Sequence, residues 1–140
     1  MKFILPALFV LWSAGDLKAA DDLAREHYTL HCQGCHLADA TGQEPYVPNM
    51  VNQIGRFAAV PGGRAYLVQV PGTANAPLTD AEIAALLNWA LREFSAATLP
   101  ADFRPYTAAE VAGYRGTRPL DILARRRTLL AALPVPQAGD

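Results

Sequence analysis

Cys32-Gln33-Gly34-Cys35-His36 is the stretch of this 140-residue sequence that decides the fold. Its two cysteines are the only ones in the chain, which excludes a framework of several disulfides. The pair also lacks the partner ligands of a closed structural zinc site. A redox-active disulfide is the other reading of Cys-x-x-Cys, but that motif belongs near a βαβ pattern, which the sequence lacks.

The histidine directly after the second cysteine completes C-x-x-C-H, the signature for covalent attachment of haem c. Two thiols three residues apart can each add to one vinyl group of the same haem and form thioethers. The adjacent imidazole of His36 then lies beneath the iron as its proximal ligand. We therefore predict one haem c, bound covalently through Cys32 and Cys35.

The overall composition fits a small folded protein. Hydrophobic residues make up 51% of the chain and charged residues 18%, which argues against disorder. The 12 basic and 13 acidic residues give a formal net charge of -1. This balance gives no reason to expect nucleic-acid binding, because displacing counterions from phosphates needs a basic surface.

The first residues have the features of a secretory signal peptide. Lys2 precedes an apolar run over residues 3–12, and small residues follow it. The run is shorter than the ~20 apolar residues that cross a bilayer. We expect residues 1–19 to be removed by cleavage after Ala19 or Ala20. The mature protein would then be periplasmic and not an integral membrane protein; an uncleaved membrane anchor is the alternative.

Helical patterns dominate the rest of the sequence and predict an all-α fold. Residues 21–30, with acidic side chains at their start, indicate a helix that leads into the first cysteine. Residues 37–61 are rich in Gly, Pro and Asn and predict mostly loop. Apolar residues recur at helical spacing over residues 78–94, after a T-x-x-E capping box formed by Thr79 and Glu82.

The last third of the sequence predicts two more helices. A second T-x-x-E box, at Thr107 and Glu110, is expected to open a helix over residues 108–115. Pro119 is suited to the first turn of a final helix over residues 120–133.

These residues together resemble the small monohaem cytochromes c of class I. The resemblance rests on C-x-x-C-H, on Tyr28 four residues before it, and on Leu78-Thr79-Asp80-Ala81-Glu82-Ile83-Ala84-Ala85-Leu86-Leu87-Asn88-Trp89. In that family an aromatic residue before the first cysteine packs against one on the later helix, and Tyr28 and Trp89 match those roles. The resemblance covers about residues 21–95. It implies a helical fold wrapped around one covalent haem, and it favours helix for the short apolar run 64–70.

We accordingly divide the chain into three parts. Residues 1–19 are the signal peptide, residues 20–95 the cytochrome c-like haem domain, and residues 96–140 a helical C-terminal extension outside the resemblance. A basic patch on this extension consists of Arg125, Arg126 and Arg127 together with Arg115 and Arg118. The patch is either a docking surface for an acidic partner or an ordinary solvated helix face.

The sixth iron ligand departs from the family pattern. The family commonly supplies a methionine from a loop just before the helix that begins here near Thr79, but residues 68–77 contain neither Met nor His. Met50 lies 14 residues after His36, and that length of chain can span ~45 Å, enough to round the haem edge. We predict Met50 as the distal ligand. An open or water-occupied site is the alternative, with Met50 only filling a gap beside the porphyrin.

Three further side chains are candidates for binding the haem propionates. Arg56 and Arg64 carry guanidinium groups, which pair well with carboxylates, and Tyr46 carries a hydroxyl. Each of them is equally compatible with a solvated surface position.

The resemblance implies an electron-transfer protein rather than an enzyme. Its expected partners are redox proteins: a periplasmic dehydrogenase or a respiratory complex on one side and a terminal oxidase or reductase on the other. An open-site haem protein, acting as a gas-binding sensor or small haem enzyme, is one alternative. A haem subunit of a larger dehydrogenase complex is another.

Overall fold

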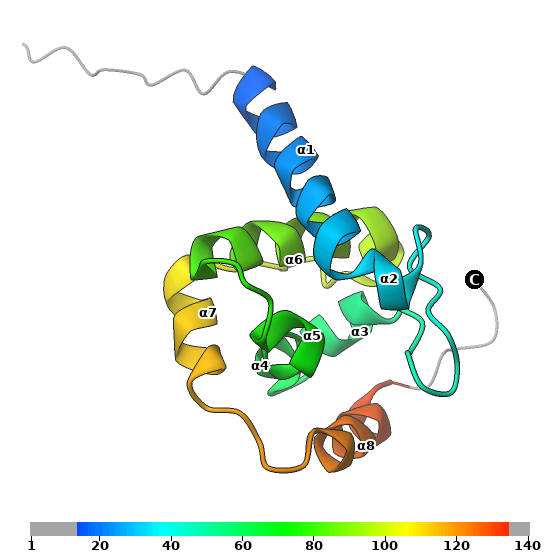
Figure 1. Cartoon of the computed structure of the whole chain (residues 1–140). Helices are drawn as coiled ribbons and strands as arrows, with labels where there is room; N and C mark the ends of the chain where they lie inside the picture. The colour runs from blue at the N-terminus through cyan, green and yellow to red at the C-terminus, as the bar shows by residue number, and fades with distance from the viewer. Residues whose placement is uncertain (1–13, 135–140) are drawn as a thin grey trace, which may run out of the picture.

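The computed structural model describes residues 14–134, and the regular structure of this range is helical (Figure 1). Residues 1–13, most of the predicted signal peptide, lie outside the described range, as do residues 135–140. The elements are α1 Ala14–His31, α2 Gln33–His36, α3 Ile54–Ala58, α4 Gly63–Gln69, α5 Pro71–Ala74, α6 Asp80–Ser95, the 3-10 turn η1 Ala96–Thr98, α7 Ala108–Arg115 and α8 Ile122–Ala132. Within residues 14–134 the only β pairing is an isolated bridge between Gln43 and Val47. The predicted all-α fold is confirmed.

The C-terminal half of α1 packs against α6 (Figure 1). Tyr28 of α1 lies between two aromatic residues of α6, with ring centroids 5.5 Å from Trp89 and 5.1 Å from Phe94. Ala24, one turn earlier and 1% exposed, lets the two helices approach closely. The expected aromatic contact between Tyr28 and Trp89 is therefore present, and it fixes the end of α1 from which the cysteines follow.

Helix α6 is the central element of the core, because it contacts α1, α3 and α7. It begins at the predicted capping box. The Thr79 hydroxyl accepts a hydrogen bond from the Glu82 amide at 3.3 Å, and the Glu82 carboxylate accepts one from the Thr79 amide at 2.7 Å. Both amides would otherwise lack helical partners. Its buried side chains include Ile83, Ala84, Leu86, Leu87, Trp89, Ala90 and Leu91.

Helix α4 confirms the expected helix at residues 64–70 and starts at a pair of glycines. Gly62 has φ +79°, in the left-handed region that favours glycine. A Cβ on Gly63 would collide with the carbonyl of Phe57, at the end of α3. The two glycines thus let the chain reverse between α3 and α4, and they pack the two short helices tightly together.

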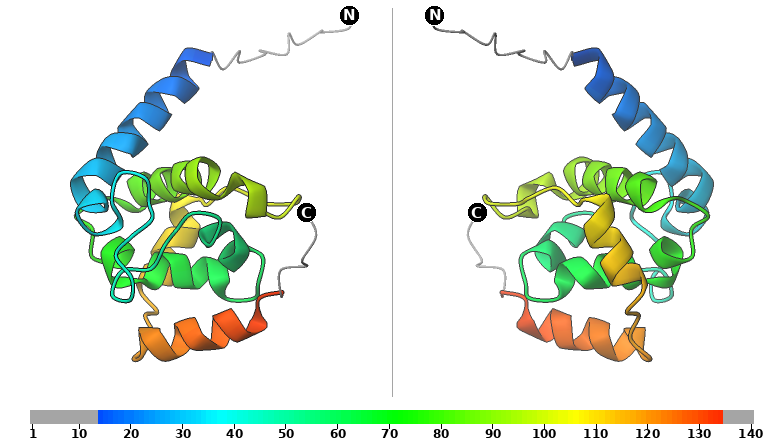
Figure 2. Two further views of the ribbon diagram at one scale, coloured as in Figure 1. Left: turned by 90° about the vertical axis from the view of Figure 1, so that its right-hand side faces the viewer. Right: turned by 90° about the vertical axis from the view of Figure 1, so that its left-hand side faces the viewer.

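The C-terminal extension packs on the same body as the haem domain. Helix α7 lies against α6 and α4, and α8 lies against α4. Tyr106, Val111 and Leu129 are buried in one core with the residues of α4 and α6. Figure 2 shows α8 along the side of the molecule farthest from α1. The last third of the chain therefore completes the fold and does not project from it.

Helix α7 spans Ala108–Arg115 as predicted, but the capping box before it and the predicted start of α8 need correction. The Thr107 hydroxyl accepts a hydrogen bond from the Glu110 amide at 3.2 Å, but the Glu110 carboxylate pairs with Arg64, so only half of the second capping box forms. Helix α8 does not begin at Pro119. It begins after Asp121, whose carboxylate accepts a 2.8 Å hydrogen bond from the amide three residues ahead. An Asp cap satisfies that amide, which a proline cannot do.

Candidate haem site

The attachment turn continues α1 almost without a break. The amide of Cys32 donates to the carbonyl of Tyr28 at 2.8 Å, and the amides of Cys35 and His36 donate to the carbonyl of Cys32 at 3.1 and 2.9 Å. Residues three and four apart on a helical turn lie on the same side. The two thiols and the imidazole are therefore presented together. Leu37, with φ +62°, then ends the turn.

The two cysteines of the turn are free thiols with different surroundings. Cys35 is exposed and Cys32 is partly buried. Burial, followed by the charge of Cys35, raises the pKa of Cys32 to about 11. Cys32 is therefore a protonated thiol at neutral pH.

The His36 ring is enclosed on one side. Its Nδ1 atom is buried and has no hydrogen-bond partner among the described residues. Burial lowers the pKa of His36, and the carbonyl of Pro48, which lies against the ring, opposes that shift in part. The imidazole is therefore neutral at neutral pH. With Nδ1 enclosed by protein, Nε2 is the nitrogen left to donate its lone pair to a metal.

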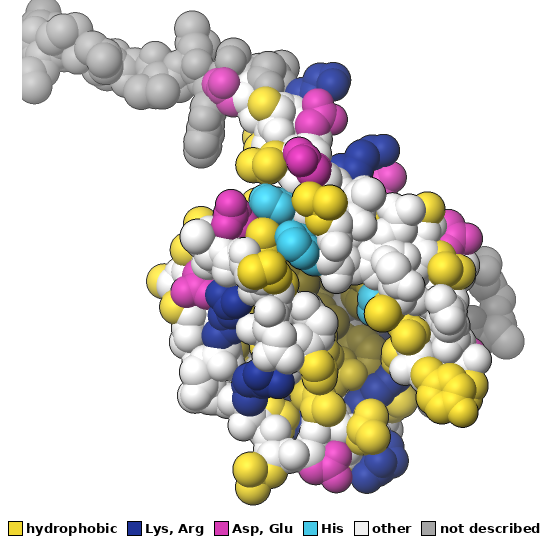
Figure 3. Space-filling view, viewed as in Figure 1, with side chains coloured by type: hydrophobic (Ala, Val, Ile, Leu, Met, Phe, Trp, Pro, Cys, Tyr) yellow, Lys and Arg dark blue, Asp and Glu magenta, His cyan; other side chains and the backbone are white. Residues whose placement is uncertain are grey.

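A hollow opens beside this turn. It lies between α2, α5 and residues 37–53, the segment that connects α2 to α3, and its inner wall is made of hydrophobic side chains (Figure 3). Partly buried apolar residues of these segments, Val51 and Val70 among them, pack against the core. The hollow can enclose a flat apolar group whose edge stays near the two thiols.

These features fit haem c. The donor set of two thiols and one neutral imidazole on a single turn suits two thioether bonds and one axial bond. The apolar wall of the hollow suits a porphyrin better than a hydrated metal ion. Within residues 14–134, moreover, no three His, Cys, Asp or Glu side chains gather as a separate metal site.

Comparison with known proteins gives the family. No family model matches the sequence. A cytochrome c-552 of Thermus thermophilus is 30% identical over 149 aligned residues, which cover 92% of this chain and 98% of that protein. The chain is a monohaem class I cytochrome c. A second cytochrome c-552 from Thermus thermophilus is 30% identical to this cytochrome over 118 residues, 70% of the chain and 90% of the relative.

Membership of this family has three consequences for the cytochrome. It implies a covalent haem c at the two cysteines, and an electron carrier rather than an enzyme. An alignment over 92% of the chain also reaches well past residues 21–95. Most of residues 96–140 therefore has a counterpart in this relative, so the extension is not outside the resemblance.

Among the described helices of the cytochrome, none combines the length and apolarity needed to cross a membrane.

Met50, the predicted distal ligand, is held by its backbone at both ends. Its amide donates to the carbonyl of Ala40 at 2.9 Å, and its carbonyl accepts a 3.0 Å hydrogen bond from the hydroxyl of Ser95. Ser95 is fully buried at the end of α6. The Met50 side chain is partly buried against the core. Ligation of iron by Met50 stays a prediction.

The three propionate candidates lie apart from one another. Tyr46 is 90% exposed on the segment between α2 and α3. Arg56 of α3 donates to the side chain of Gln53 at 3.2 Å and to the carbonyl of Pro134 at 2.9 Å. Arg64 belongs to a separate network between α4 and α7. Propionate binding by these residues stays a prediction.

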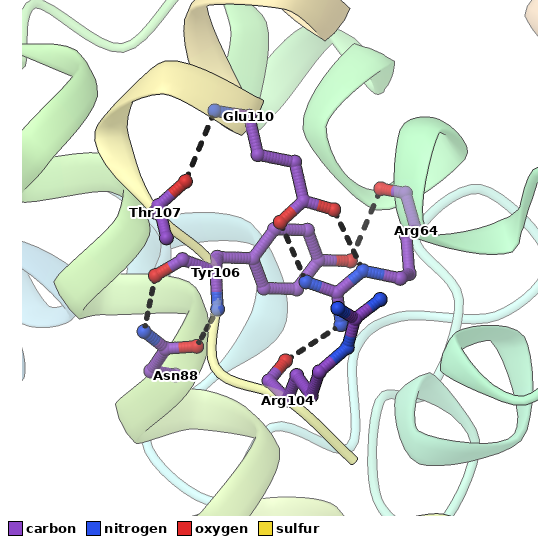
Figure 4. Close-up of polar contacts among 6 residues, drawn as sticks. All are labelled: Arg64, Asn88, Arg104, Tyr106, Thr107 and Glu110. Carbon is purple, nitrogen blue, oxygen red and sulfur yellow. Dashed lines mark hydrogen bonds and ion pairs between the residues drawn. The ribbon is translucent and has the colours of Figure 1, made fainter. Parts of the chain in front are cut away.

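Arg64 forms a bidentate ion pair with Glu110 of α7, with both N···O distances 2.7 Å (Figure 4). It also donates to the carbonyl of Arg104 at 2.8 Å, and its guanidinium lies 4.0 Å from the centre of the Tyr106 ring. The hydrogen bonds from Arg64 lower the pKa of Glu110 and raise that of Arg64 itself. The Arg64 guanidinium thus links α4 to the extension through its hydrogen bonds to Glu110 and Arg104.

Arg126 is a further candidate for binding a haem propionate, and the sequence alone does not single it out. Its Nη1 atom is buried without a hydrogen-bond partner among the described residues, and its guanidinium lies 5.8 Å from the centre of the Phe57 ring. Figure 3 shows basic side chains at the edge of the hollow, over α8. The sequence does not show which of the three consecutive arginines is buried, because that depends on how α8 packs.

Arg115 holds the segment in which the family places its methionine. Its guanidinium donates to the carbonyls of Ala74, Ala76 and Leu78 at 3.2, 2.9 and 3.0 Å, and to the Asp80 carboxylate at 2.8 Å. One side chain of α7 thus fixes the chain from the end of α5 to the start of α6. We call this set of contacts the Arg115 clamp.

Proposed function

We propose that this cytochrome is exported to the periplasm and carries single electrons between redox partners. Haem c is bound through Cys32 and Cys35, with His36 as the proximal ligand. The observation that carries the proposal is the attachment turn, which presents two thiols and a neutral imidazole beside an apolar hollow. The bound haem supplies one-electron chemistry at its iron.

The protein residues keep the site rigid and dry. Tyr28 packs between Trp89 and Phe94 and donates to the carbonyl of Leu37 at 2.7 Å, so both ends of the attachment turn are fixed. A rigid turn keeps His36 in one position in both oxidation states. The apolar wall excludes water, which lowers the local dielectric constant around the iron.

We also assign Arg126 to a haem propionate. A buried guanidinium nitrogen without a partner is costly, and a carboxylate restores the missing hydrogen bond with charge assistance. The basic edge of the hollow over α8 supports this role. Arg64, by contrast, already has a bidentate carboxylate partner in Glu110.

The proposed export and partners rest on the N-terminal residues and on the surface around the attachment turn. The predicted signal peptide, residues 1–19, supports a periplasmic location, where a dehydrogenase or respiratory complex would deliver electrons and a terminal oxidase or reductase would accept them. Leu30 and Leu37, which flank the attachment turn, and Tyr46 are exposed. A small apolar surface around the haem edge suits the transient docking of electron-transfer proteins.

The test is to express the full chain in a bacterium that attaches haem to C-x-x-C-H proteins. The expected product is a periplasmic protein without residues 1–19 that retains haem after denaturation and undergoes a reversible one-electron titration. Cys32→Ser combined with Cys35→Ser removes the covalent haem. Gln33→Ala, in the same turn, is the matched control and keeps it. Haem that is extracted equally from both variants and wild type contradicts the proposal.

A further inference from the structure

We infer that the sixth position of the haem iron is open in this cytochrome, and that the ferrous protein binds small neutral diatomic ligands such as carbon monoxide. The inference rests on the proposed function, because it takes haem attachment and proximal ligation by His36 as given. It departs from the sequence expectation for Met50. It follows from where the chain places each side chain that could bind iron.

Strong axial ligands of haem iron carry a thioether, imidazole, thiolate or amine. Over residues 14–134 the side chains of these kinds are Lys18, His27, His31, Cys32, Cys35, His36 and Met50. Cys32, Cys35 and His36 are used in attachment and proximal ligation. Lys18 lies at the far end of α1, where it pairs with Asp22 at 3.0 Å. Three candidates remain.

His27 and His31 belong to the proximal side. Both lie on α1, directly before the attachment turn, and their rings stack with centroids 6.2 Å apart. Nε2 of His27 lies 3.7 Å from the Glu82 carboxylate at the start of α6. Because α1 and α6 pack together behind the turn that carries His36, neither imidazole faces the opposite side of the haem.

Met50 also lies on the His36 side. The carbonyl of Pro48 lies against the His36 ring, whose buried Nδ1 faces protein and not iron. Met50 follows two residues later, which is a reach of at most ~7 Å. Its backbone is then held at Ala40 and at Ser95 of α6. The backbone of Met50 is therefore held close to the proximal histidine, and its side chain packs against the core.

The wall opposite His36 has no strong ligand. Across the hollow from α2, which carries His36, this wall is formed by α5 and the segment that leads to α6 (Figure 3). The polar side chains of residues 70–79 are Thr73, Asn75 and Thr79. The Asn75 side-chain oxygen accepts a 2.7 Å hydrogen bond from Arg118, and Thr79 caps α6. The Arg115 clamp holds the carbonyls of this wall. The wall is thus fixed in a form that leaves the iron without a protein donor.

An open iron in an apolar hollow selects its ligand by charge. A neutral diatomic molecule enters without losing strong hydration, whereas an anion must be desolvated. Carbon monoxide is the probe of choice because it binds ferrous iron and not ferric iron. A protein with thioether ligation must first release that ligand, which weakens binding.

The experiment uses the full chain, loaded with haem, in the ferrous state. Wild type is expected to show a five-coordinate, high-spin spectrum and to bind carbon monoxide stoichiometrically. The oxidised protein is expected to lack the sulfur-to-iron charge-transfer band. In Met50→Leu, which keeps the side-chain volume, the affinity for carbon monoxide should stay within about twofold of wild type. His27→Gln and His31→Gln are the matched controls for the two remaining imidazoles, and neither should change the spectrum more than Met50→Leu does.

A low-spin, six-coordinate ferrous wild type overturns the inference. So does an affinity for carbon monoxide that rises about tenfold or more in Met50→Leu, His27→Gln or His31→Gln. If Met50→Leu does not fold, the wild-type titration alone decides. Haem retained after denaturation is measured on the same samples, so failed attachment counts against the proposed function, and attached six-coordinate haem counts against this inference only.

Discussion

The hydroxyl of Tyr28 donates a 2.7 Å hydrogen bond to the carbonyl of Leu37, and this bond joins α1 to the residue directly after the attachment turn. Leu37 has φ +62°, so its carbonyl is turned away from the helical ladder of α2. Burial, followed by the charges of Cys32 and Asp39, raises the pKa of Tyr28 to about 12. The phenol therefore stays protonated, and the bond persists, throughout the physiological range.

Tyr28→Phe is expected to keep the aromatic contacts with Trp89 and Phe94 but to leave the Leu37 carbonyl unpaired. The free energy of unfolding of the haem-loaded protein should fall by about 1–2 kcal/mol. Denaturant unfolding followed by haem absorbance measures this. Tyr46→Phe is the matched control, because Tyr46 is 90% exposed and should change stability by less than about 0.5 kcal/mol. Equal losses in the two variants would show that the hydrogen bond contributes nothing.

Glu110→Gln is expected to weaken the link between α4 and α7. The pair that Glu110 forms with Arg64 is bidentate, and both side chains are less than a quarter exposed. The free energy of unfolding should fall by about 2 kcal/mol at neutral pH. Glu93→Gln is the control, because the oxygen of Glu93 is 3.9 Å from Arg25 on an exposed surface and should lose less than about 0.5 kcal/mol.

The contribution of Glu110 should also depend on pH, with a defined sign. Its hydrogen bonds from Arg64 lower its pKa in the folded state below the ordinary value of 4.5. The unfolded chain therefore takes up a proton first as pH falls, and the stabilisation is lost between 4.5 and the lower folded pKa. The difference between wild type and Glu110→Gln should be full above 4.5 and shrink below it. A difference independent of pH would contradict this account.

Arg115→Met should open the segment between α5 and α6. It removes four hydrogen bonds from one guanidinium, three of them to carbonyls that need partners. The free energy of unfolding should fall by about 3 kcal/mol, since bonds from a charged donor are the strong ones. Amide exchange at residues 74–78 should accelerate with it. Arg92→Met, which breaks an exposed pair with Asp21, should cost at most about 1 kcal/mol and leave that exchange unchanged.

Arg126→Gln tests the propionate assignment through the redox potential. A partly buried positive charge near the haem favours the reduced iron, so its loss should lower the midpoint potential. The variant should also lose stability in the haem-loaded form. Arg127→Gln removes the same charge from an exposed neighbour on α8, where solvent screens it. Equal shifts in the two variants would assign the effect to the net charge of α8 and not to a contact of Arg126.

The elements that sequence could predict are those set by local chemistry. The capping box at Thr79 and Glu82 is complete, because both partners lie within one turn and no distant group competes for them. The box at Thr107 is half formed, because Arg64, 46 residues away, takes the Glu110 carboxylate. Pattern alone could not reveal that competition.

The residues of the site likewise fall into those that local sequence predicts and those that tertiary packing places. The attachment residues Cys32, Cys35 and His36 are adjacent in sequence, so their spacing already carries their chemistry. The position of Met50 depends on hydrogen bonds to Ala40 and Ser95. The length of chain between His36 and Met50 allowed many positions and could not predict this one. The special position of Arg126 depends on packing across α8 and α3, which no local pattern encodes.

The Arg115 clamp closes the haem site from a residue 79 positions after His36. A chain that crosses a membrane from its N-terminus presents the attachment turn long before Arg115 emerges. Enzymes that attach haem would therefore meet an unenclosed turn with both thiols accessible. If the chain is exported from its N-terminus as proposed, the far wall would assemble only after the last third of the polypeptide arrives, and the C-terminal helices would enclose the haem site last.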